Sequence, residues 1–287
     1  MPRIDFEKYQ GNGNDFIIID SRDYDFYNDS LLKNINADKL CDRNFGIGAD
    51  GVIFVLNAVE KHNDAKMIIY NSDNSEAEMC GNGIRCLIQY LKDSTFHNHQ
   101  KYEYRIETKA GLKVSTYDQD KIKVNMGKPI FDKNLIPTNF IEKINDIPAK
   151  HFDSSVFKCI GYSCSMGNPH LIFFVDNLKK INLNYLGPFF ENNEYFPQKT
   201  NVHFCKIIDR FNIEALVWER GAGKTLACGT GACAIHSVAF KLNYCSDKST
   251  IKLPGGTLNI EWGDVGDDVF MTGDAEKVFS GNIITNR

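Results

Sequence analysis

Apolar residues recur at helical spacing in two separate stretches of the chain. The first stripe consists of Ile84, Leu87, Ile88 and Leu91, and the second of Ile235, Val238, Ala239 and Leu242. Both follow the i, i+3, i+4, i+7 pattern of a helix with one apolar face. Short runs rich in β-branched and aromatic residues, at 16–20, 52–56 and 171–176, predict strands instead. The pattern therefore predicts an α+β protein with one main helix in each half.

The predicted elements occur twice in the same order. Gly13-Asn14-Asp15 precedes one strand-like run, and Gly167-Asn168-Pro169-His170 precedes its counterpart. Further along, each half has a Cys-Gly-x-Gly turn, at residues 80–83 and 228–231, followed by its helical stripe. Residues 110–114 and 124–127 are then echoed by residues 256–260 and 270–273. Repetition of a unit this long indicates duplication rather than a solenoid. We expect two halves that meet near residues 127–134, with a ligand-binding cleft between them.

Composition and charge narrow the classes of function. The 287 residues carry a formal net charge of −4, and no basic run is interleaved with aromatic residues. Nucleic acid is therefore not an expected partner. The first residues lack a hydrophobic signal segment and no run of 18 apolar residues occurs, so no membrane association is expected. An odd count of nine cysteines favours reduced thiols over a disulfide framework. We expect a soluble cytoplasmic protein.

Three stretches resemble nucleotide-binding or metal-binding motifs, but each lacks a feature that the motif requires. Residues 46–51 match G-x-G-x-x-G, but they precede a strand, whereas a dinucleotide site has the glycines after one. Residues 221–225 resemble the end of a P-loop, yet Trp218 occupies the place of its first glycine. The cysteines of the two Cys-Gly-x-Gly turns are not part of a C-x-x-C pair. The sequence therefore predicts no metal and no cofactor.

Cys80 and Cys228 each stand where a predicted helix begins. A helix N-terminus offers unpaired N–H groups and a partial positive charge, which favour thiolate and bind carboxylate. The following glycine lets an anion approach the backbone closely. Each cysteine could equally be a buried structural residue beside a turn. Because the motif occurs twice, two thiols can flank one carbon, so that one removes a proton and the other returns a proton on the opposite face.

The chain resembles the diaminopimelate epimerase family over essentially its whole length. The resemblance rests on residues 13–16, Arg43 with residues 46–51, residues 79–86, residues 166–170 and residues 219–231. It implies two pseudo-symmetric α/β halves, each a strand-rich, barrel-like sheet wrapped round a central helix, with the active site in the cleft between them. The halves are then residues 1–127 plus 274–287 and residues 128–273. The resemblance further implies a homodimer that interconverts LL- and meso-diaminopimelate, in lysine and peptidoglycan precursor synthesis, without pyridoxal phosphate or any other cofactor.

The resemblance also implies roles for individual residues. Cys80 and Cys228 are the paired base and acid, and the backbone of Gly81, Asn82, Gly229 and Thr230 holds the reacting carboxylate. Asn14 and Glu219 lie near the reacting amino group. The distal centre is bound by Asn71, Asn168, Asn201 and Arg220, which suits the forked donor of arginine and the hydrogen-bonding amides. His170 and Glu219 are candidates for adjusting the thiol pKa values.

The chain departs from the family pattern at three positions. Lys224 replaces a common glutamate, Asn74 stands where glycine is usual, and Gly51 occupies a position that some members fill with glutamine. Two other functions stay open. The first is a proline or hydroxyproline racemase, which uses the same two-thiol mechanism on a cyclic substrate with one carboxylate. The second is a non-catalytic amino-acid binding protein, which would keep the carboxylate-binding helix starts but would not transfer protons. The set Asn71, Asn168, Asn201 and Arg220 argues against the first, and retention of both thiols argues against the second.

Overall fold

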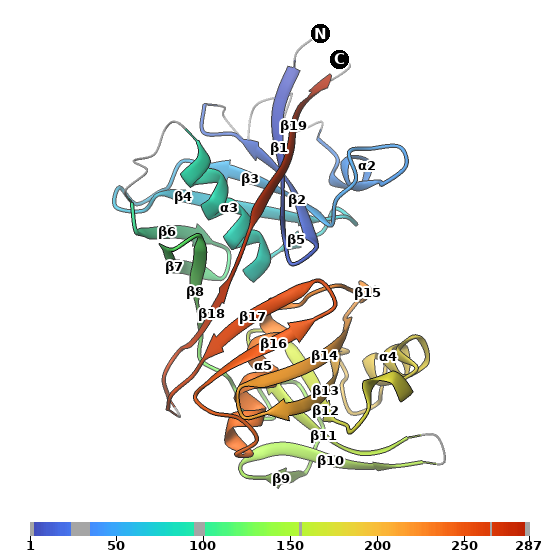
Figure 1. Ribbon diagram of the computed structural model, residues 1–287. Helices are drawn as coiled ribbons and strands as arrows, with labels where there is room; N and C mark the ends of the chain where they lie inside the picture. The colour runs from blue at the N-terminus through green and yellow to red at the C-terminus, as the bar shows by residue number, and fades with distance from the viewer. Residues whose placement is uncertain (1–2, 24–34, 95–100, 155–156, 265, 285–287) are drawn as a thin grey trace. The chain divides into compact units, whose positions relative to one another are not determined.

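The computed structural model (Figure 1) describes residues 3–23, 35–94, 101–154, 157–264 and 266–284. The chain divides into two compact units, Met1–Val124 with Gly273–Arg287, and Asn125–Thr272. The sequence expectation placed the two divisions after Gly127 and after Gly273.

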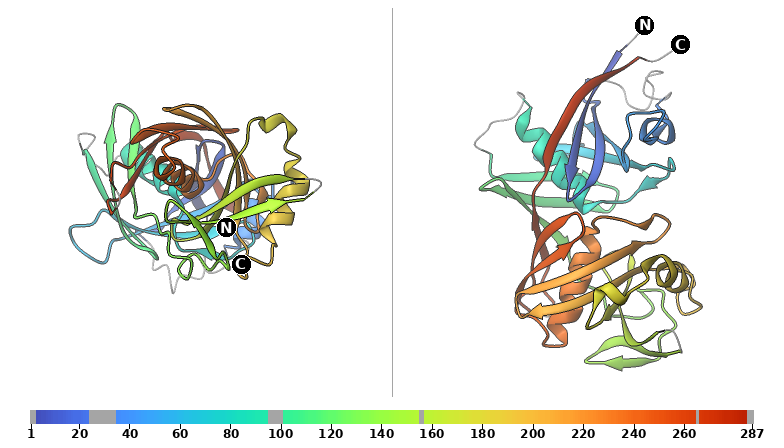
Figure 2. Two further views of the ribbon diagram at one scale, coloured as in Figure 1. Left: turned by 90° about the horizontal axis from the view of Figure 1, so that it is seen from below. Right: turned by 45° about the vertical axis from the view of Figure 1, so that its right-hand side comes forward.

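The first unit is a mixed sheet with one long helix. From one edge the strands run β19, β1, β2, β3, β4, β6, β7 and β8; the β2–β3 and β4–β6 pairs are parallel and the others antiparallel. The short β5 pairs with β4. β19, the last strand, lies beside β1, the first (Figure 2). The bounds are β1 Arg3–Gly11, β2 Asn14–Asp20, α2 Ala37–Cys41, β3 Gly51–Leu56, β4 Ala65–Asn71, β5 Glu76–Ala77, α3 Gly81–Asp93, β6 Glu103–Thr108, β7 Gly111–Asp118, β8 Lys121–Gly127 and β19 Glu276–Ile284.

The second unit repeats this topology. Its strands run β9, β10, β11, β12, β13, β14, β16, β17 and β18, with β12–β13 and β14–β16 parallel. The short β15 pairs with β14 as β5 pairs with β4. The bounds are β9 Glu142–Ile144, β10 Ile147–Asp153, β11 Lys158–Ser165, β12 Pro169–Phe174, η1 Leu178–Lys180, α4 Leu183–Glu191, β13 Asn201–Asp209, β14 Asn212–Glu219, β15 Gly223–Lys224, α5 Gly229–Lys241, β16 Lys248–Leu253, β17 Gly256–Glu261 and β18 Val269–Gly273.

The order of parallel and antiparallel pairs is the same from β1 to β8 as from β11 to β18. In both units the long helix follows the short hairpin strand along the chain and precedes the next strand of the sheet: α3 comes after β5, and α5 comes after β15. The place that β10 occupies beside β11 is taken in the first unit by β19, which lies beside β1. This correspondence confirms the two-half α+β fold that the repeated phrases predicted.

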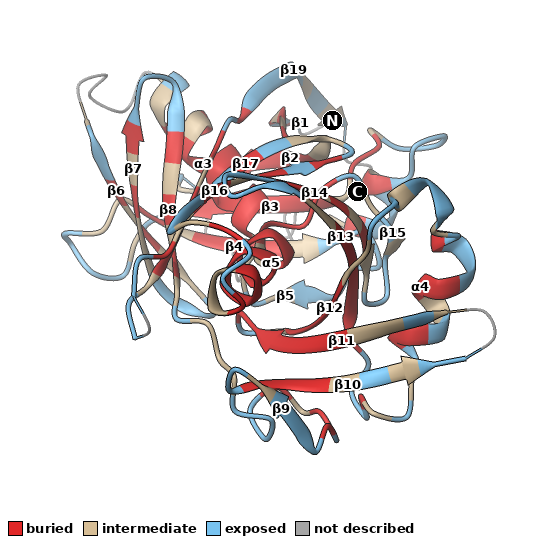
Figure 3. Cartoon of the chain, turned by 60° about the horizontal axis from the view of Figure 1, so that its bottom comes forward, coloured by how far each residue is buried: buried red, intermediate tan, exposed pale blue. Residues whose placement is uncertain are grey.

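The long helices are the cores of their units. α5 contacts β11, β12, β13, β16 and β17, strands from both ends of its sheet, so the sheet curls round it. Ten of the thirteen residues of α5, and ten of the thirteen of α3, are buried. Figure 3 accordingly colours most of α5 red. Burial on nearly all sides explains why each helix carries glycine and cysteine, and α5 also alanine, beside its apolar stripe.

Two central strands of the first unit do not alternate as a half-exposed strand would. β3 is buried at every position, and β2 at all five of its interior positions. A second apolar layer explains this in the first unit, where α2 residues pack with Val52, Phe54 and Ile17 on the outer face. In the second unit a phenylalanine-rich cluster of Phe140, Phe173, Phe190 and Phe204 covers the outer face under α4. Strands buried on both faces read as continuous apolar runs.

Candidate functional site

Cys80 caps the N-terminus of α3. Its backbone is extended, and its sulfur accepts the backbone N–H of Gly83 at 3.4 Å. Its carbonyl accepts the first helical hydrogen bond, from Ile84, at 2.9 Å. Cysteine is an unusual residue here, because serine, threonine, aspartate and asparagine are the favoured caps. The sulfur is therefore held at the positive end of the helix by the geometry that normally holds an oxygen.

Cys228 caps α5 in the same way. Its sulfur accepts the N–H of Gly231 at 3.3 Å, and its carbonyl accepts from Ala232 at 2.9 Å. The hydroxyl of Thr230 lies 3.5 Å from the sulfur. The backbone angles of the two caps differ by about ten degrees or less, with φ/ψ of −138°/118° at Cys80 and −128°/111° at Cys228. The duplication therefore extends to the atoms around each thiol.

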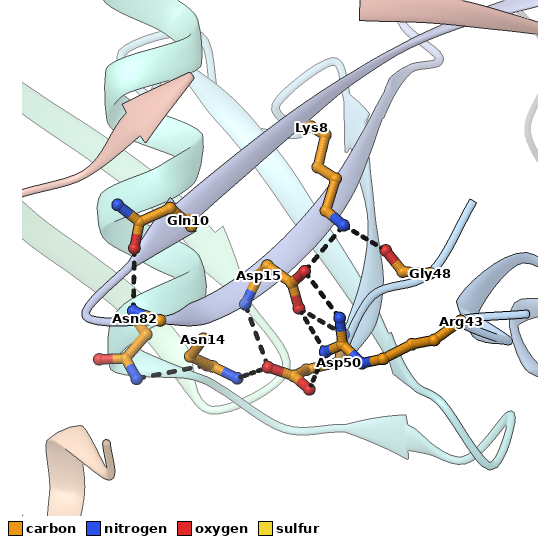
Figure 4. A network of polar contacts seen from close by, with 9 residues as sticks. Lys8, Gln10, Asn14, Asp15, Arg43, Gly48, Asp50 and Asn82 are labelled. Atoms are coloured by element: carbon orange, nitrogen blue, oxygen red, sulfur yellow. Dashed lines mark hydrogen bonds and ion pairs between the residues drawn. The ribbon is translucent and has the colours of Figure 1, made fainter. Parts of the chain in front are cut away.

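Asn14 connects Cys80 to a group of charged residues. The thiol lies 3.8 Å from the Asn14 Oδ1 atom. The same oxygen accepts a hydrogen bond from Asn82 Nδ2 at 3.2 Å (Figure 4). The Asn14 Nδ2 group donates to Asp50 at 2.8 Å. Because a carboxylate only accepts, Asp50 fixes which end of the Asn14 amide faces the sulfur. The amide oxygen is thereby directed toward the thiol.

Asp50 is held in turn by Arg43 and Asp15. Arg43 donates to Asp50 at 2.8 Å and to both oxygens of Asp15 at 2.8 and 3.1 Å. Lys8 forms an ion pair with Asp15 at 2.8 Å. Burial raises the Asp15 pKa, but the hydrogen bonds from Arg43 and Lys8 outweigh burial, so the pKa is lowered overall. The resulting network of ion pairs and hydrogen bonds supports Asn14.

The Asn82 side chain helps to hold Asn14 in place beside Cys80. It is only 2 % exposed, and its Oδ1 atom accepts from Arg85 at 3.0 Å. Arg85, which is fully buried, also donates to Asn12 Oδ1 at 2.6 Å and to the Asp274 carbonyl at 3.1 Å. One guanidinium thus ties the helix start to the β1–β2 turn and to the returning C-terminal segment. A bound carboxylate would have the backbone of Asn82, rather than its side chain, as a partner.

The Cys228 thiol has a pKa well above its ordinary value. Burial raises its pKa well above the ordinary value, and the negative charge of Glu219 raises it further, while Thr230 and the Gly231 N–H lower it less. At this cysteine burial opposes the effect of the helix field on the thiol pKa, since the residue is only 4 % exposed and desolvation disfavours the charged form. Glu219, one of the groups that raise this pKa, accepts a hydrogen bond from Thr225 at 2.6 Å.

The other predicted residues of the second unit form two hydrogen-bonded groups. His170 Nε2 lies 2.9 Å from Asn168 Oδ1, and His170 Nδ1 lies 2.8 Å from His203 Nε2. Asn201 Nδ2 donates to the Pro169 carbonyl at 2.8 Å, and Asn201 Oδ1 accepts the Arg220 backbone N–H at 3.0 Å. The Arg220 guanidinium donates to the Gln198 carbonyl at 3.1 Å. Asn201 therefore holds the start of β12 and the residue after β14 together.

Each unit thus gathers its own predicted residues. In the first unit Cys80, Asn14 and Asn82 are joined directly, whereas Asn71, at the exposed end of β4, bonds Ser75 at 3.0 Å in its own turn. In the second unit Cys228 lies with Gly229, Thr230 and Glu219. His170 contacts Asn168 and His203 rather than a thiol.

The departures from the family pattern have local explanations at two positions. Asn74 has a positive φ of 65°, a conformation that asparagine tolerates best after glycine, and its side chain accepts the Ala37 N–H at 3.1 Å. A Cβ at Gly51 would lie 2.7 Å from the Tyr70 carbonyl oxygen, so a side chain there requires a shift of the backbone. Lys224 lies in β15, exposed and opposite Trp218, and nothing in the structure explains it.

Among the residues of these groups that were not singled out from the sequence are Asp50, Arg85 and His203. Asp50 and Arg85 lie inside motifs that were read for their glycines and cysteines. His203 lies two residues after Asn201 and so shares its face of β13, which was an available signal. No helix of the described segments is long and apolar enough to span a membrane. Within the same segments, no cluster of three or more His, Cys, Asp or Glu side chains is arranged to hold a metal ion.

The sequence matches one family over most of its length. The family model described as diaminopimelate epimerase matches residues 6–131 and 162–278. A diaminopimelate epimerase of Prochlorococcus marinus (strain NATL1A) is 48% identical over 282 residues, covering 97% of this chain and 98% of that protein. One of Nostoc punctiforme is 44% identical over 285 residues, covering 98% and 99%.

Solved structures of low sequence identity share the fold. A Bacillus anthracis phenazine biosynthesis protein of the PhzF family has a TM-score of 0.71 at 18% identity, covering 99% of this chain and 100% of that one. A hydroxyproline epimerase from Agrobacterium vitis, with bound trans-4-hydroxy-L-proline, has a TM-score of 0.66 at 14% identity, covering 98% and 92%. At such identities the likeness concerns the fold alone.

Proposed function

This chain belongs to the diaminopimelate epimerase family, and we propose that it interconverts LL- and meso-diaminopimelate by a two-cysteine mechanism without a cofactor. The observation that carries the proposal is the pair of matched caps, in which the sulfurs of Cys80 and Cys228 each accept the N–H three residues on, at 3.4 and 3.3 Å. A thiol in this place can exchange a proton with a carbon whose carboxylate is bound at the same helix start.

In the proposed reaction one proton leaves the α-carbon of the substrate and another is added to its opposite face. The thiolate of Cys80 takes the α-proton of the substrate, and the electron pair of the broken C–H bond spreads onto the carboxylate. The thiol of Cys228 gives its proton to the opposite face of that carbon and becomes thiolate. The raised pKa of Cys228 supports this direction, since a protonated thiol is the form that can donate. In the reverse direction the two cysteines exchange roles.

The substrate carboxylate is bound, in this proposal, by both helix starts. The backbone N–H groups of Gly81, Asn82, Gly229 and Thr230 belong to first turns, where N–H groups have no acceptor within the helix. Helix N-termini stabilise negative charge, and the charge on the carboxylate grows as the α-proton leaves. These donors therefore stabilise the transition state more than the ground state.

Polar side chains distinguish the two ends of the substrate. Near the reacting amino group, the Asn14 amide oxygen and the Glu219 carboxylate are acceptors suited to an ammonium. At the distal centre, Asn71, Asn168, Asn201 and Arg220 bind the second ammonium and carboxylate. Arginine suits a carboxylate because its planar fork can make two parallel hydrogen bonds. Recognition of two charged ends is what would separate this substrate from a cyclic amino acid.

Incubation of the purified protein with LL-diaminopimelate in deuterated water, with no cofactor added, tests the proposal. Early in the reaction the meso product should carry deuterium at the inverted centre, while unreacted LL substrate keeps its proton. Mass spectrometry of both isomers measures this. Early deuterium in recovered substrate, at the level found in product, would indicate one base rather than two.

The same assay separates the rival functions. Turnover of L-proline or trans-4-hydroxy-L-proline, with none of diaminopimelate, would identify a racemase of cyclic amino acids. Binding of diaminopimelate with no proton exchange would identify a binding protein. A homodimer and a cytoplasmic location remain predictions, which sedimentation and cell fractionation can test.

A further inference from the structure

His203 is a buried histidine that the proposed reaction does not use. It lies on β13, two residues after Asn201, and both side chains face the start of β12. Asn201 holds the Pro169 carbonyl, while His203 Nε2 lies 2.8 Å from His170 Nδ1. His170 and His203 are both fully buried. A pair of imidazoles in such surroundings has few permitted arrangements of its protons.

The contacts allow one direction for the hydrogen bonds. Asn168 presents Oδ1 to His170 Nε2 at 2.9 Å, and an amide oxygen only accepts, so His170 carries its proton on Nε2. Burial, then His203 and Arg220, lower the His170 pKa well below its ordinary value, so the ring is neutral and its Nδ1 is an acceptor. His203 must therefore donate from Nε2.

The remaining nitrogen of His203 agrees with this direction. Its Nδ1 atom is buried and has no hydrogen-bond partner among the described residues. With the proton on Nε2, this atom is an unpaired acceptor, whereas the other tautomer would bury an unpaired N–H, which is rarer. The chain of donors thus runs from His203 to His170 to the Asn168 oxygen.

The His203 ring also lies against the cap of α5. A Cβ at Gly231 would be 2.4 Å from His203 Cε1 and 2.9 Å from Nε2. Gly231 is the residue whose N–H donates to the Cys228 sulfur at 3.3 Å. His203 therefore contacts the helix start that carries the thiol on one side and the group that holds Asn168 on the other.

We propose that His203 is a positioning residue that sets the orientation of the Asn168 amide for the distal carboxylate of the substrate. By donating to His170 Nδ1 it holds the His170 proton on Nε2, and that proton holds the Asn168 oxygen. The Asn168 NH₂ group, on a partly exposed side chain, is then the end presented to a ligand. An amide donor selects a carboxylate oxygen rather than an ammonium. This inference rests on the proposed function for the identity of the ligand.

Nitrogen-15 NMR of the whole protein, labelled at histidine, tests the direction of the chain without any substrate. Nitrogen shifts distinguish the Nε2–H and Nδ1–H tautomers of a neutral imidazole. We expect both His170 and His203 to be neutral and protonated on Nε2 at pH 7.5. An Nδ1–H tautomer at either ring would overturn the inference.

Two variants of His203 test its effect on the substrate. His203→Gln keeps an N–H donor, whereas His203→Met keeps comparable bulk and has none. For diaminopimelate we expect His203→Met to raise KM about tenfold with kcat changed less than about threefold, and His203→Gln to stay within about threefold in both. Equal losses in the two folded variants, or no change in KM for His203→Met, would contradict the donor role.

His236→Met is the matched control, because His236 is also fully buried in this unit but bonds Ser249, at 2.7 Å. It should lower the midpoint of thermal unfolding and leave KM unchanged. If His203→Met does not fold, the tautomers of the wild-type protein and of His170 in His203→Gln still decide the question. If the wild-type protein fails to epimerise diaminopimelate, the proposed function fails while the tautomer result stands on its own.

Discussion

The backbone nitrogen of Gly231 lies 3.3 Å from the sulfur of Cys228 and donates its hydrogen to it. The equivalent pair in the other unit, Gly83 and Cys80, is 3.4 Å apart. Each thiol is therefore oriented by the helix that it caps, and the residue three positions on is a glycine in both halves. In the second unit the reason for glycine is visible, since the His203 ring occupies the space of a side chain.

Replacing Gly231 with alanine should destabilise the protein. The new Cβ would lie 2.4 Å from His203 Cε1, closer than real Cβ contacts, so the ring or the helix start must move. We expect a loss of about 1 to 3 kcal/mol in the free energy of unfolding, measured in urea, together with a fall in kcat/KM. Gly263→Ala is the control, because a Cβ there meets nothing within 4 Å and should leave stability nearly unchanged. If Gly231→Ala were as stable as the wild-type protein, the His203 ring would be able to move away from the new Cβ at little cost.

Cys80→Ala and Cys228→Ala should each abolish epimerisation in a folded protein. Each thiol serves one face of the reacting carbon, and the loss of a positioned acid or base costs at least about 10² in rate. Steady-state kinetics and circular dichroism check this pair. Cys159→Ser is the control, since its half-buried sulfur lies 3.2 Å from the Phe174 carbonyl, which a hydroxyl can also reach. Near-normal turnover by either alanine variant would remove that cysteine from the mechanism.

Arg220→Lys should weaken use of the substrate while keeping the charge. Lysine cannot reproduce the planar fork of arginine. Loss of a bidentate contact should therefore lower kcat/KM by a factor that corresponds to about 1 to 3 kcal/mol of transition-state binding. The backbone N–H that Arg220 donates to Asn201 is unaffected, so the fold should persist. An unchanged kcat/KM for diaminopimelate would assign Arg220 another role.

Stability should fall in mildly acidic solution because of His203. Burial lowers its pKa from 6.5 to about 3, so below about pH 6.5 the unfolded chain takes up a proton that the folded protein does not. Above about pH 6.5 the neutral His203 therefore costs no stability. As the pH falls from there toward 3, the free energy of unfolding decreases by up to about 1.4 kcal/mol per pH unit. Between pH 7.5 and 5.0 the free energy of unfolding should therefore drop less in His203→Gln than in wild type. Parallel curves for the two proteins would contradict a neutral buried His203.

Much of the fold could be predicted from the sequence because the same pattern of elements occurs in both halves. The stripe beginning at Ile84 and the one beginning at Ile235 predicted the two long helices, and these are the helices α3 and α5. The cysteine before each stripe predicted a helix start, and both cysteines are caps. Helical periodicity and capping act within a few residues, so local sequence carries them.

Contacts between distant residues could not be predicted in this way. Asp50 orients Asn14 across 36 positions, Arg85 reaches Asp274 across 189, and His203 meets His170 across 33. These partners are chosen by which strands pair and which faces are covered, and a single sequence does not state either. The continuous burial of β3 has the same origin, since it depends on the second layer packed outside the sheet.

The sequence by itself determined the kinds of groups that each unit carries, namely a thiol at a helix start together with amides, and in the second unit an arginine. Only the tertiary structure decided their state. The helix field favours a thiolate at Cys228, yet burial and the charge of Glu219 raise the pKa of its thiol, because desolvation depends on every element packed around the sulfur. Likewise the proton positions of His170 and His203 follow from three side chains that meet only in the folded protein. Local chemistry is encoded along the chain, whereas dielectric surroundings and hydrogen-bond partners arise when the chain packs.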